Sequence, residues 1–313
     1  MSQTPITKEI REALEATVKG RLEWNVPMND RTTIKVGGPA DCVFSPNDAE
    51  DVSAFVQLAR RFKLPYEPIG AGSNLIVRDG GYRGVLVQMK GFDKVEQVDE
   101  THLKAGAGVP LPTVVARARD WGMGGAEWIC GIPGEVGGAL AMNAGTNEGQ
   151  TFDVVSEITI VDKNGRVKTL PKEKVPFEYR SWGLDRGTVA VEAVFAFQKG
   201  DPKEIGKKIE ASKAKRKASQ PLDMPNAGCM FKNVVDKHGK TRVHAGKLID
   251  DLGLKGVRLR GAQVSDVHAN FIVNVGNATA KDVLGLLALV RDKVKDATGT
   301  VLESEWRVIG EDE

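Results

Sequence analysis

Glycine placement is the feature that most constrains how this chain can fold. The sequence has 35 glycines, and they concentrate in residues 69–77, IGAGSNLIV, and residues 131–149, GIPGEVGGALAMNAGTNEG. Without a Cβ, successive backbone N–H groups can converge on an anion such as a pyrophosphate, although a tight turn is the alternative interpretation of either loop taken alone. Neither segment contains GxGxxG, GxxxxGKS or GxxxxGKT, so a Rossmann or P-loop site loses its main support.

Length and composition indicate a globular protein of several domains. A chain of 313 residues exceeds the usual single domain, so two or three domains are expected. The net charge of +2 gives no reason to expect a nucleic-acid partner. The first residues lack the pattern of a signal peptide, and no apolar run reaches the length of a membrane span. We therefore expect a cytoplasmic protein without a membrane partner, and the sequence is compatible with a monomer.

The cysteines and histidines argue against a metal or disulfide framework. Cys42, Cys130 and Cys229 are odd in number and far apart, with no CxxC pair. The histidines show no HxxxH or HExxH spacing, and they stand at positions 102, 238, 244 and 268. We expect no metal.

The first 90 residues predict alternating helices and strands. Ile10, Leu14, Val18 and Leu22 recur every four residues, which predicts one amphipathic helix, and residues 47–62 predict a second with its N-cap at Asn47 or Asp48. Short apolar runs bounded by Gly, Pro or Asp predict strands at 40–46, 66–70, 75–79 and 84–89. This pattern is typical of an α+β region.

The remainder of the chain continues the mixed pattern. Residues 157–170 alternate around Asn164-Gly165, which predicts a β-hairpin, and residues 187–198 predict another strand. Helices are expected at 201–221, at 245–253 and after a cap at Thr279. In the closing segment, 300–310, strand alternation would place Glu303, Glu305 and Arg307 on one face.

Seven segments together resemble the MurB family of UDP-N-acetylenolpyruvoylglucosamine reductases. In order they are NDRTTIKVGGPA, GAGSNLIV, GIPGEVGGALAMNAG, FEYRSW, NAGCMFKN, the segment AGKLIDDLG through HANFIVN, and ESEWRVIG. The resemblance extends from about Asn29 to Gly310, and NAGCMFKN and HANFIVN are its most specific parts. The short run between FKNV and HANF has no room for the family's additional loop and helix, so the chain resembles the loop-lacking type II form.

The resemblance implies an α+β fold and a flavoenzyme of peptidoglycan precursor synthesis. The implied fold is a two-subdomain FAD-binding unit of the FAD-linked oxidase (PCMH-type) class, followed by an α+β substrate-binding domain. The expected boundaries are 1–28 for an N-terminal helical segment, 29–200 for the FAD-binding domain and 201–313 for the C-terminal domain. The implied reaction uses NADPH and FAD to reduce UDP-N-acetylglucosamine enolpyruvate to UDP-N-acetylmuramate. The alternatives are an FAD-linked oxidase of another substrate and a non-catalytic protein that binds a UDP-sugar.

By the same resemblance, three glycine-containing segments should lie against FAD. The family often has threonine where this chain has Glu135, and because a carboxylate would repel a pyrophosphate, no flavin contact is assigned to Glu135. The expected FAD-binding residues are Lys35, Val36, Gly37, Gly38, Pro39, Gly70, Ala71, Gly72, Ser73, Asn74, Leu75, Gly131, Ile132, Pro133, Gly134, Gly137, Gly138, Asn143, Ala144 and Gly145.

Reduction of an enol ether conjugated to a carboxylate needs a hydride, a proton and a group that stabilises the developing negative charge. The resemblance assigns charge stabilisation to Arg180, whose planar fork suits a carboxylate. It assigns the proton donor to Cys229, at a position where the family usually has serine. A thiol, with a reference pKa of about 8.5, can donate while neutral, but Lys232 nearby could instead hold it as a thiolate. Glu305 should lie beside the substrate and stabilise the enolic intermediate or orient its carboxylate.

Residues for the UDP part of the substrate also follow from the resemblance. They are Tyr179, Lys217, Gln220, Lys232 and Asn233. Val234 stands where the family typically has proline, which weakens the assignment of Asn233.

Overall fold

The computed structural model describes residues 6–236 and 241–312, so His238 lies outside the described residues. The chain divides into two compact units. Unit 1 comprises Met1–Trp24, Asp41–Gly70 and Arg83–Arg216, and unit 2 comprises Asn25–Ala40, Ala71–Tyr82 and Lys217–Glu313. Each unit is therefore assembled from three separate stretches of chain. The sequence-derived domain boundaries at residues 28 and 200 stay a prediction.

Unit 1 carries two larger sheets, two two-stranded sheets (β9 with β10, and β8 with β14) and most of the helices. Its helices are α1 (Lys8–Thr17), α2 (Ala49–Phe62), α3 (Leu111–Asp120), α4 (Val136–Ala141), α5 (Thr151–Val154) and α6 (Pro202–Ser219), with the last residues of α6 in unit 2. Its strands are β1 (Arg21–Pro27), β2 (Pro39–Ser45), β3 (Tyr66–Ile69), β5 (Tyr82–Gln88), β6 (Val95–Gln97), β7 (His102–Gly106), β8 (Met123–Gly124), β9 (Gly145–Thr146), β10 (Gly149–Gln150), β11 (Val155–Val161), β12 (Val167–Pro171), β13 (Val189–Ala196) and β14 (Gln198–Lys199); β1, β2 and β5 each include residues of unit 2.

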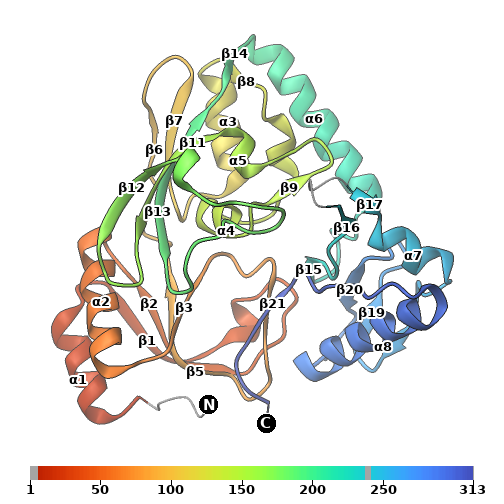
Figure 1. Ribbon diagram of the computed structural model, residues 1–313, viewed down its shortest axis with the longest axis horizontal. Coiled ribbons are helices and arrows are strands. Elements are labelled where there is room, and N and C mark those ends of the chain that lie inside the picture. The colour runs from red at the N-terminus through yellow and green to blue at the C-terminus, as the bar shows by residue number, and fades with distance from the viewer. Residues whose placement is uncertain (1–5, 237–240, 313) are drawn as a thin grey trace. The chain divides into compact units, whose positions relative to one another are not determined.

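The first sheet of unit 1 has the strand order β1-β2-β5-β3, and Figure 1 shows α1 and α2 side by side along it. In α1, Thr7 caps the first turn and Ile10 and Leu14 are buried, as the period of four predicts. The predicted extension of this helix to Leu22 is wrong. The helix ends at Thr17, and Leu22 lies in β1. The backbone is extended from Val18 onwards. Gly20 then packs against the Ser45 carbonyl oxygen, so closely that a Cβ on Gly20 would lie 2.2 Å from that oxygen.

Helix α2 is confirmed, with Asp48 as its N-cap. Its buried side packs Val52, Phe55 and Val56 into the core, which is the stripe that periodicity predicts. Asp51 is 3% exposed although it is charged. Its two carboxylate oxygens accept hydrogen bonds from the backbone N–H groups of Lys19, Gly20 and Asn47 at 2.8 to 3.1 Å. These bonds fasten the connection between α1 and β1 to the start of α2.

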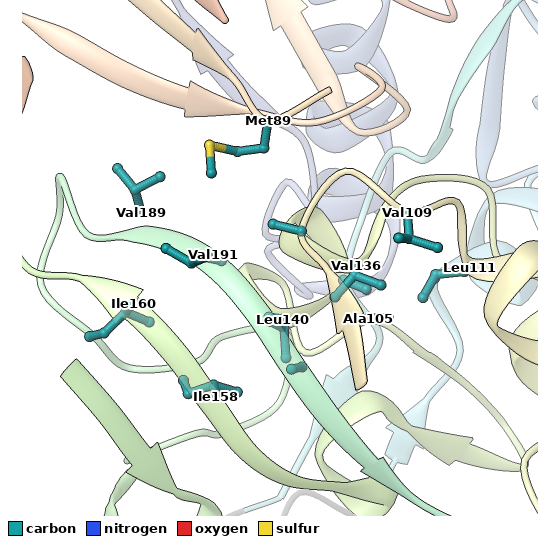
Figure 2. Packing of buried hydrophobic residues seen from close by; sticks show 14 of the residues in the cluster. Met89, Ala105, Val109, Leu111, Val136, Leu140, Ile158, Ile160, Val189 and Val191 are labelled. Atoms are coloured by element: carbon teal, nitrogen blue, oxygen red, sulfur yellow. The ribbon is translucent and has the colours of Figure 1, made fainter. Parts of the chain in front are cut away.

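The second sheet of unit 1 is antiparallel, with the order β12-β11-β13-β7-β6. The hairpin predicted at Asn164-Gly165 is confirmed: Val161 pairs with Val167, and Gly165 has a φ of +78°. Figure 2 shows the apolar side chains gathered beside this sheet, including Ile158 and Ile160 from β11 and Leu140 from α4. One continuous cluster of buried hydrophobic residues includes side chains from both sheets, so unit 1 has a single core.

Unit 2 is smaller and is also α+β. Its helices are α7 (Ala245–Asp251) and α8 (Ala280–Thr298). Its strands are β4 (Leu75–Val77), β15 (Asn226–Cys229), β16 (Val234–Val235), β17 (Thr241–Val243), β18 (Arg258–Leu259), β19 (Ala262–Val264), β20 (Phe271–Asn274) and β21 (Arg307–Ile309).

A four-stranded antiparallel sheet, β15-β20-β19-β18, forms the centre of unit 2, and α8 packs against it (Figure 1). The predicted cap of α8 is confirmed, because the Thr279 hydroxyl accepts a hydrogen bond from the Asp282 N–H and the Asp282 carboxylate accepts one from the Thr279 N–H. Asp79 adds two further bonds, accepting from the N–H groups of Ala280 and Lys281 at 2.8 Å each. A charge at the helix N-terminus thus fixes α8 to the segment that follows β4.

The closing strand is much shorter than the sequence predicts. Strand β21 covers only Arg307–Ile309 and pairs in parallel with β4. Leu302, Trp306 and Ile309 are buried, a spacing that breaks strict alternation, so the prediction that Glu303, Glu305 and Arg307 share one strand face is wrong. The reason is a turn at Ser304, whose hydroxyl accepts a hydrogen bond from the Trp306 N–H.

Two further expectations concern the described residues only. None of the helices in residues 6–236 and 241–312 combines the length and hydropathy of a bilayer span. The same residues contain no group of three or more histidine, cysteine, aspartate or glutamate side chains that could hold a metal ion.

We predict that Asp51→Ala lowers the free energy of unfolding by about 2 to 4 kcal/mol, because three backbone N–H groups in part-buried hydrogen bonds would lose a charged acceptor. Asp51→Asn, which keeps one carbonyl acceptor, should cost less. Urea unfolding followed by circular dichroism measures both. Glu50→Ala, at the exposed neighbouring acid, is the control and should change stability by less than about 0.5 kcal/mol. Equal effects of Asp51→Ala and Glu50→Ala would contradict the prediction.

Candidate active site

Cys229 ends strand β15 and is the least buried of the three cysteines. Cys42 and Cys130 are buried in unit 1, whereas Cys229 is half-buried in unit 2. Burial raises the pKa of the Cys42 thiol to about 12 and also raises the pKa of Cys130. These two thiols are therefore inert core residues, and Cys229 is the one that a ligand can reach.

The backbone after Cys229 is held by Asn270, which is 3% exposed. The Asn270 side chain donates to the Phe231 carbonyl at 2.8 Å and accepts from the Phe231 N–H at 3.1 Å, while the Asn270 carbonyl accepts from the Met230 N–H at 2.9 Å. An asparagine side chain thus replaces a strand partner where β15 ends. These bonds give Asn270 an architectural role.

Glu305 lies beside the Cys229 segment through its backbone. The Glu305 N–H donates to the Met230 carbonyl at 3.0 Å, and Phe231 forms an antiparallel bridge with Ser304. Cys229 and Glu305, which are 76 positions apart in the sequence, are therefore neighbours in unit 2. The expected strand pattern did not reveal this proximity, because Glu305 precedes β21.

The segment Gly70 to Leu75 brings two further polar residues to the same place. A Cβ on Gly228, the residue before Cys229, would lie 3.7 Å from the Ser73 carbonyl oxygen. The Arg307 N–H donates to the Asn74 carbonyl at 3.0 Å, two residues after Glu305. Unit 2 therefore gathers Ser73, Asn74, Cys229 and Glu305 within one small region.

Glycine in the unit 2 loops is required by close packing of backbone on backbone. Gly72 has a φ of +71°, and a Cβ there would lie 2.4 Å from the Arg31 carbonyl oxygen. A Cβ on Gly38 would lie 1.9 Å from the Asp79 carbonyl oxygen, and Gly37 has a φ of +129°. The Thr33 hydroxyl donates to the Asn226 carbonyl at 2.6 Å, which ties this loop to the start of β15. Close backbone packing and positive φ values thus account for these three glycines, and the packing also positions the loop beside Cys229.

The side chains of Lys232 and Asn233 are engaged with the protein. The Lys232 ammonium donates to Glu303 at 2.6 Å, so its charge is directed to an exposed carboxylate that the sequence interpretation left out of the site. Asn233 accepts from the Ala245 N–H at 3.1 Å at the start of α7. Asn233 therefore has a structural task, and Lys232 could reach a substrate diphosphate only in competition with Glu303.

Arg180 and Tyr179 form the tip of a tight turn in unit 1. Glu178 and Ser181 pair across this turn, and Arg180 has a φ of +60°, a left-handed conformation that is uncommon for a residue with a side chain. The Arg180 guanidinium lies 5.0 Å from the centroid of the Tyr179 ring and donates to the Gly145 carbonyl at 3.1 Å. The arginine is thereby held beside the glycine-rich segment 131–145.

That segment is fastened to the loop after β7. The Leu111 N–H donates to the Gly134 carbonyl, and the Val136 and Gly137 N–H groups donate to the carbonyls of Val109 and Ala107, all at 2.8 to 3.0 Å. A Cβ on Gly137 would lie 3.1 Å from the Ala107 Cβ, so this glycine serves close packing. At the next position of α4, a Cβ on Gly138 would meet no atom within 4 Å, so space is open beside it.

Asn143 is fully buried and its side chain is committed to the protein. Its amide nitrogen donates to the Gln150 side chain and to the Glu178 carbonyl at 3.0 Å each, and its oxygen accepts from the Phe152 N–H at 3.1 Å. Asn143 therefore joins the glycine segment to the turn that carries Arg180. Its expected contact with FAD stays a prediction, and these bonds favour a role in positioning.

Two buried oxygen atoms in the glycine segments have no hydrogen-bond partner among the described residues. They are Oδ1 of Asn74 in unit 2 and Oε2 of Glu135 in unit 1. Buried polar atoms are nearly always satisfied, so an unsatisfied one marks a place where a ligand or a water molecule can supply the missing hydrogen bond. Within unit 1, the Glu135 oxygen and the open space beside Gly138 fit a polar ligand such as FAD. Within unit 2, the Asn74 oxygen fits such a ligand as well.

Glu135 is the residue that sequence reasoning did not assign to the site. Its carboxyl approaches Gly70: a Cβ on Gly70 would lie 3.4 Å from Oε2 of Glu135. Burial raises the pKa of Glu135 to about 7, with a smaller opposing effect from Lys90. The signal in the sequence was the departure from threonine at this position.

The expected site residues fall into both units. Tyr179, Arg180, Gly70 and the residues of segment 131–145 belong to unit 1. Unit 2 holds the residues of segments 35–39 and 71–75 together with Lys217, Gln220, Cys229, Lys232, Asn233 and Glu305. The contacts above bring together Cys229, Glu305, Ser73 and Asn74 in unit 2, and Arg180 with Gly145 in unit 1.

Comparison with known proteins connects these residues to a family. Residues 220–309 match the C-terminal domain of UDP-N-acetylenolpyruvoylglucosamine reductase, and residues 40–171 match an FAD-binding domain. The chain is 40% identical over 299 residues to the UDP-N-acetylenolpyruvoylglucosamine reductase of Geobacter sulfurreducens, covering 96% of this chain and 97% of that protein. The protein of the same name from Desulforamulus reducens is 40% identical over 301 residues, with 96% and 97% covered.

A solved structure gives the same result. The crystal structure of UDP-N-acetylenolpyruvylglucosamine reductase (MurB) from Thermus caldophilus superimposes with a TM-score of 0.78 at 34% identity, covering 93% of this chain and 99% of that one. The expected fold class, an FAD-binding domain followed by the C-terminal domain of this family, is confirmed. With relatives of 40% identity along nearly the full length, this chain belongs to the family of UDP-N-acetylenolpyruvoylglucosamine reductases.

Proposed function

We propose that this chain reduces UDP-N-acetylglucosamine enolpyruvate to UDP-N-acetylmuramate, with NADPH as reductant and FAD as cofactor, in the synthesis of peptidoglycan precursors. Family membership supports the reaction. The roles of the residues rest mainly on one observation: Cys229 and Glu305 are neighbours in unit 2, and both lie close to Asn74. A weak acid and a carboxylate thus adjoin a segment expected to hold FAD.

Bound FAD supplies the hydride that the enolpyruvyl double bond receives. The residues of segments 35–39 and 70–75, and those of segment 131–145, would hold it, with Asn74 supplying a buried polar atom. The glycine conformations at Gly37 and Gly72 position these loops before any ligand binds.

Each of the three proposed catalytic residues has a distinct task. Hydride addition to one carbon of the double bond leaves negative charge delocalised onto the substrate carboxylate, and Arg180 donates hydrogen bonds to that charge. Cys229 then donates the Sγ proton to the adjacent carbon, which completes the saturated lactyl ether. Glu305 orients the substrate. The thiolate formed on Cys229 takes a proton from solvent before the next turnover.

Held in place by Gly145 and the Tyr179 ring, the Arg180 side chain is already arranged for its task. If the guanidinium had to become ordered during the reaction, the entropy lost on ordering would reduce the stabilisation that it gives to the developing charge. Lys217 and Gln220 are the proposed contacts for the UDP moiety, and Lys232 and Asn233 contribute from the segment after Cys229. The small-molecule partners are the UDP-sugar and NADPH, and we propose that the enzyme acts as a monomer in the cytoplasm.

The first experiment is a visible absorption spectrum of the purified protein, before and after anaerobic addition of NADPH and then of the enolpyruvyl UDP-sugar. We expect the absorption of bound FAD to disappear with NADPH and to return with the UDP-sugar. Loss without return would favour an oxidase that acts on another substrate. No flavin binding even after added FAD would favour a protein that only binds the UDP-sugar, and either result would overturn the proposed reaction.

We predict that Cys229→Ala leaves reduction by NADPH intact but slows oxidation by the enolpyruvyl UDP-sugar by about 10² to 10⁴-fold, because the proton donor is lost. Cys229→Ser restores a donor in the same place and should stay within about tenfold of the wild type. Stopped-flow measurement separates the two half-reactions. If the alanine variant is oxidised as fast as the wild type, Cys229 is not the donor.

Arg180→Lys should lower the rate of substrate reduction by about 10² to 10³-fold, since a lysine cannot keep the bond to Gly145 and present a planar fork at once. FAD content and the rate of NADPH oxidation should change little. Arg186→Lys is the matched control, because Arg186 is 82% exposed and follows Arg180 in the same connection. Equal rates for both variants would remove Arg180 from the reaction.

A further inference from the structure

Glu135 places an acidic side chain inside one of the glycine segments. Its Oε2 atom is buried and has no hydrogen-bond partner among the described residues. A carboxylate oxygen buried without a donor is costly, because water would otherwise solvate its charge. The mechanism above uses no acid at this position, so the residue needs a separate explanation.

The neighbours of the Glu135 carboxyl in the described part of the chain do not compensate a negative charge. Gly70 at the end of β3 approaches Oε2, Gly138 follows on α4, and Pro110 pairs with the Glu135 backbone. None of these residues titrates. Lys90, which is exposed, is the charged group that acts on Glu135, and its influence is smaller than that of burial. Apolar glycine surface and a weakly acting cation therefore favour the neutral acid.

The same surroundings leave room for a ligand. A Cβ on Gly138 would meet nothing within 4 Å, and the Cα of Gly138 lies 3.9 Å from the position of a Cβ on Gly70. Gly70, Gly138 and Glu135 are thus close neighbours within unit 1, and the space beside Gly138 is open. A neutral carboxyl group at the edge of that space offers one O–H donor, which an anionic carboxylate would lack.

We propose that Glu135 binds FAD as a neutral carboxylic acid, with its O–H group donating a hydrogen bond to an acceptor oxygen of the cofactor. This inference rests on the proposed function, because it requires FAD in the glycine segments. It removes the repulsion between a carboxylate and the cofactor, since the group carries no charge while it donates. Glu135 is then a cofactor-binding residue whose contribution depends on its proton.

The affinity of the protein for FAD should depend on pH through Glu135. The Glu135 carboxyl in the FAD-free protein has a pKa of about 7. Below that pH the donor is present before FAD arrives, and above it binding must take up a proton from solvent. The affinity for FAD should therefore be constant on the acid side and fall by up to about tenfold for each pH unit above the pKa.

The test compares FAD affinity, from quenching of flavin fluorescence, in wild type, Glu135→Gln and Glu135→Ala between about pH 6 and about pH 8.5. The glutamine amide keeps a donor of similar shape that does not titrate. We expect Glu135→Gln to match the wild type at the acid end and to bind FAD up to about thirtyfold more tightly at the alkaline end. Glu135→Ala should bind more weakly than the wild type at the acid end, because it has no donor. Parallel pH profiles for wild type and Glu135→Gln would overturn the proposal.

A second measurement does not depend on the variants' affinity. The infrared spectrum of the wild-type holoenzyme at about pH 8 should contain a protonated-carboxyl C=O band that Glu135→Gln lacks. Its absence would show that Glu135 is ionised when FAD is bound and would overturn the proposal. If FAD binds but its affinity does not vary with pH as expected, the role of Glu135 is contradicted and the proposed reaction is not. If the wild type fails to bind FAD at any pH, both the role of Glu135 and the proposed reaction are contradicted.

Thermal unfolding of the FAD-free proteins provides a check that the carboxyl is buried as the neutral acid. The unfolded pKa is about 4.5 and the folded pKa about 7. Between these values only the unfolded state gains from ionisation, so the wild type should lose stability relative to Glu135→Gln as pH rises through that window. A constant difference in Tm across the window would contradict burial of a neutral acid.

Discussion

The hydrogen bond from the Glu305 N–H to the Met230 carbonyl is the contact on which the placement of the Cys229 segment depends. It joins the closing segment of the chain to the residue after Cys229. Asn270 holds the other side of the same segment with three hydrogen bonds. Because the backbone of residues 229–231 is fixed from both sides, the Cys229 side chain is presented from a rigid support, which a proton donor needs if it is to reach one particular carbon.

Glycine serves two different purposes in this chain. At Gly38 and Gly72, carbonyl oxygens lie so close that any side chain would collide, so these glycines allow the loops of unit 2 to pack on one another. At Gly138 no neighbour stands where a Cβ would point, and the missing side chain leaves open space. A count of glycines does not separate the two purposes. Only the surroundings show which glycine shapes the protein and which one leaves room for a ligand.

What the sequence could predict follows from how local the determining interactions are. The stripe of α2, the Thr279 cap and the Asn164-Gly165 turn depend on residues a few positions apart, and all three are confirmed. The predicted end of α1 and the predicted length of β21 were wrong, because contacts outside the periodic pattern decide both: Gly20 packs on Ser45, and the segment before β21 turns at Ser304.

The candidate site divides in the same way. The resemblance supplied Cys229, Arg180 and Glu305 as residues, but Asn270 and Asn143, which support them, act through partners as many as 39 positions away. Periodicity carries no information about such contacts, and only the folded chain brings the partners together.

Glu135 is the residue for which the sequence and the folded structure lead to different conclusions. As an anion it would be the wrong residue for a segment that holds a phosphorylated cofactor, and on that ground the sequence excluded it from the site. Burial changes its chemistry, because a carboxyl group surrounded by Gly70 and Gly138 holds its proton. A protonated carboxyl and the hydroxyl of the threonine common in this family are both neutral O–H donors. Glutamate in place of threonine then preserves a hydrogen-bond donor at this position, but the glutamate proton can be lost. The substitution is therefore conservative at low pH, whereas at high pH it removes the donor.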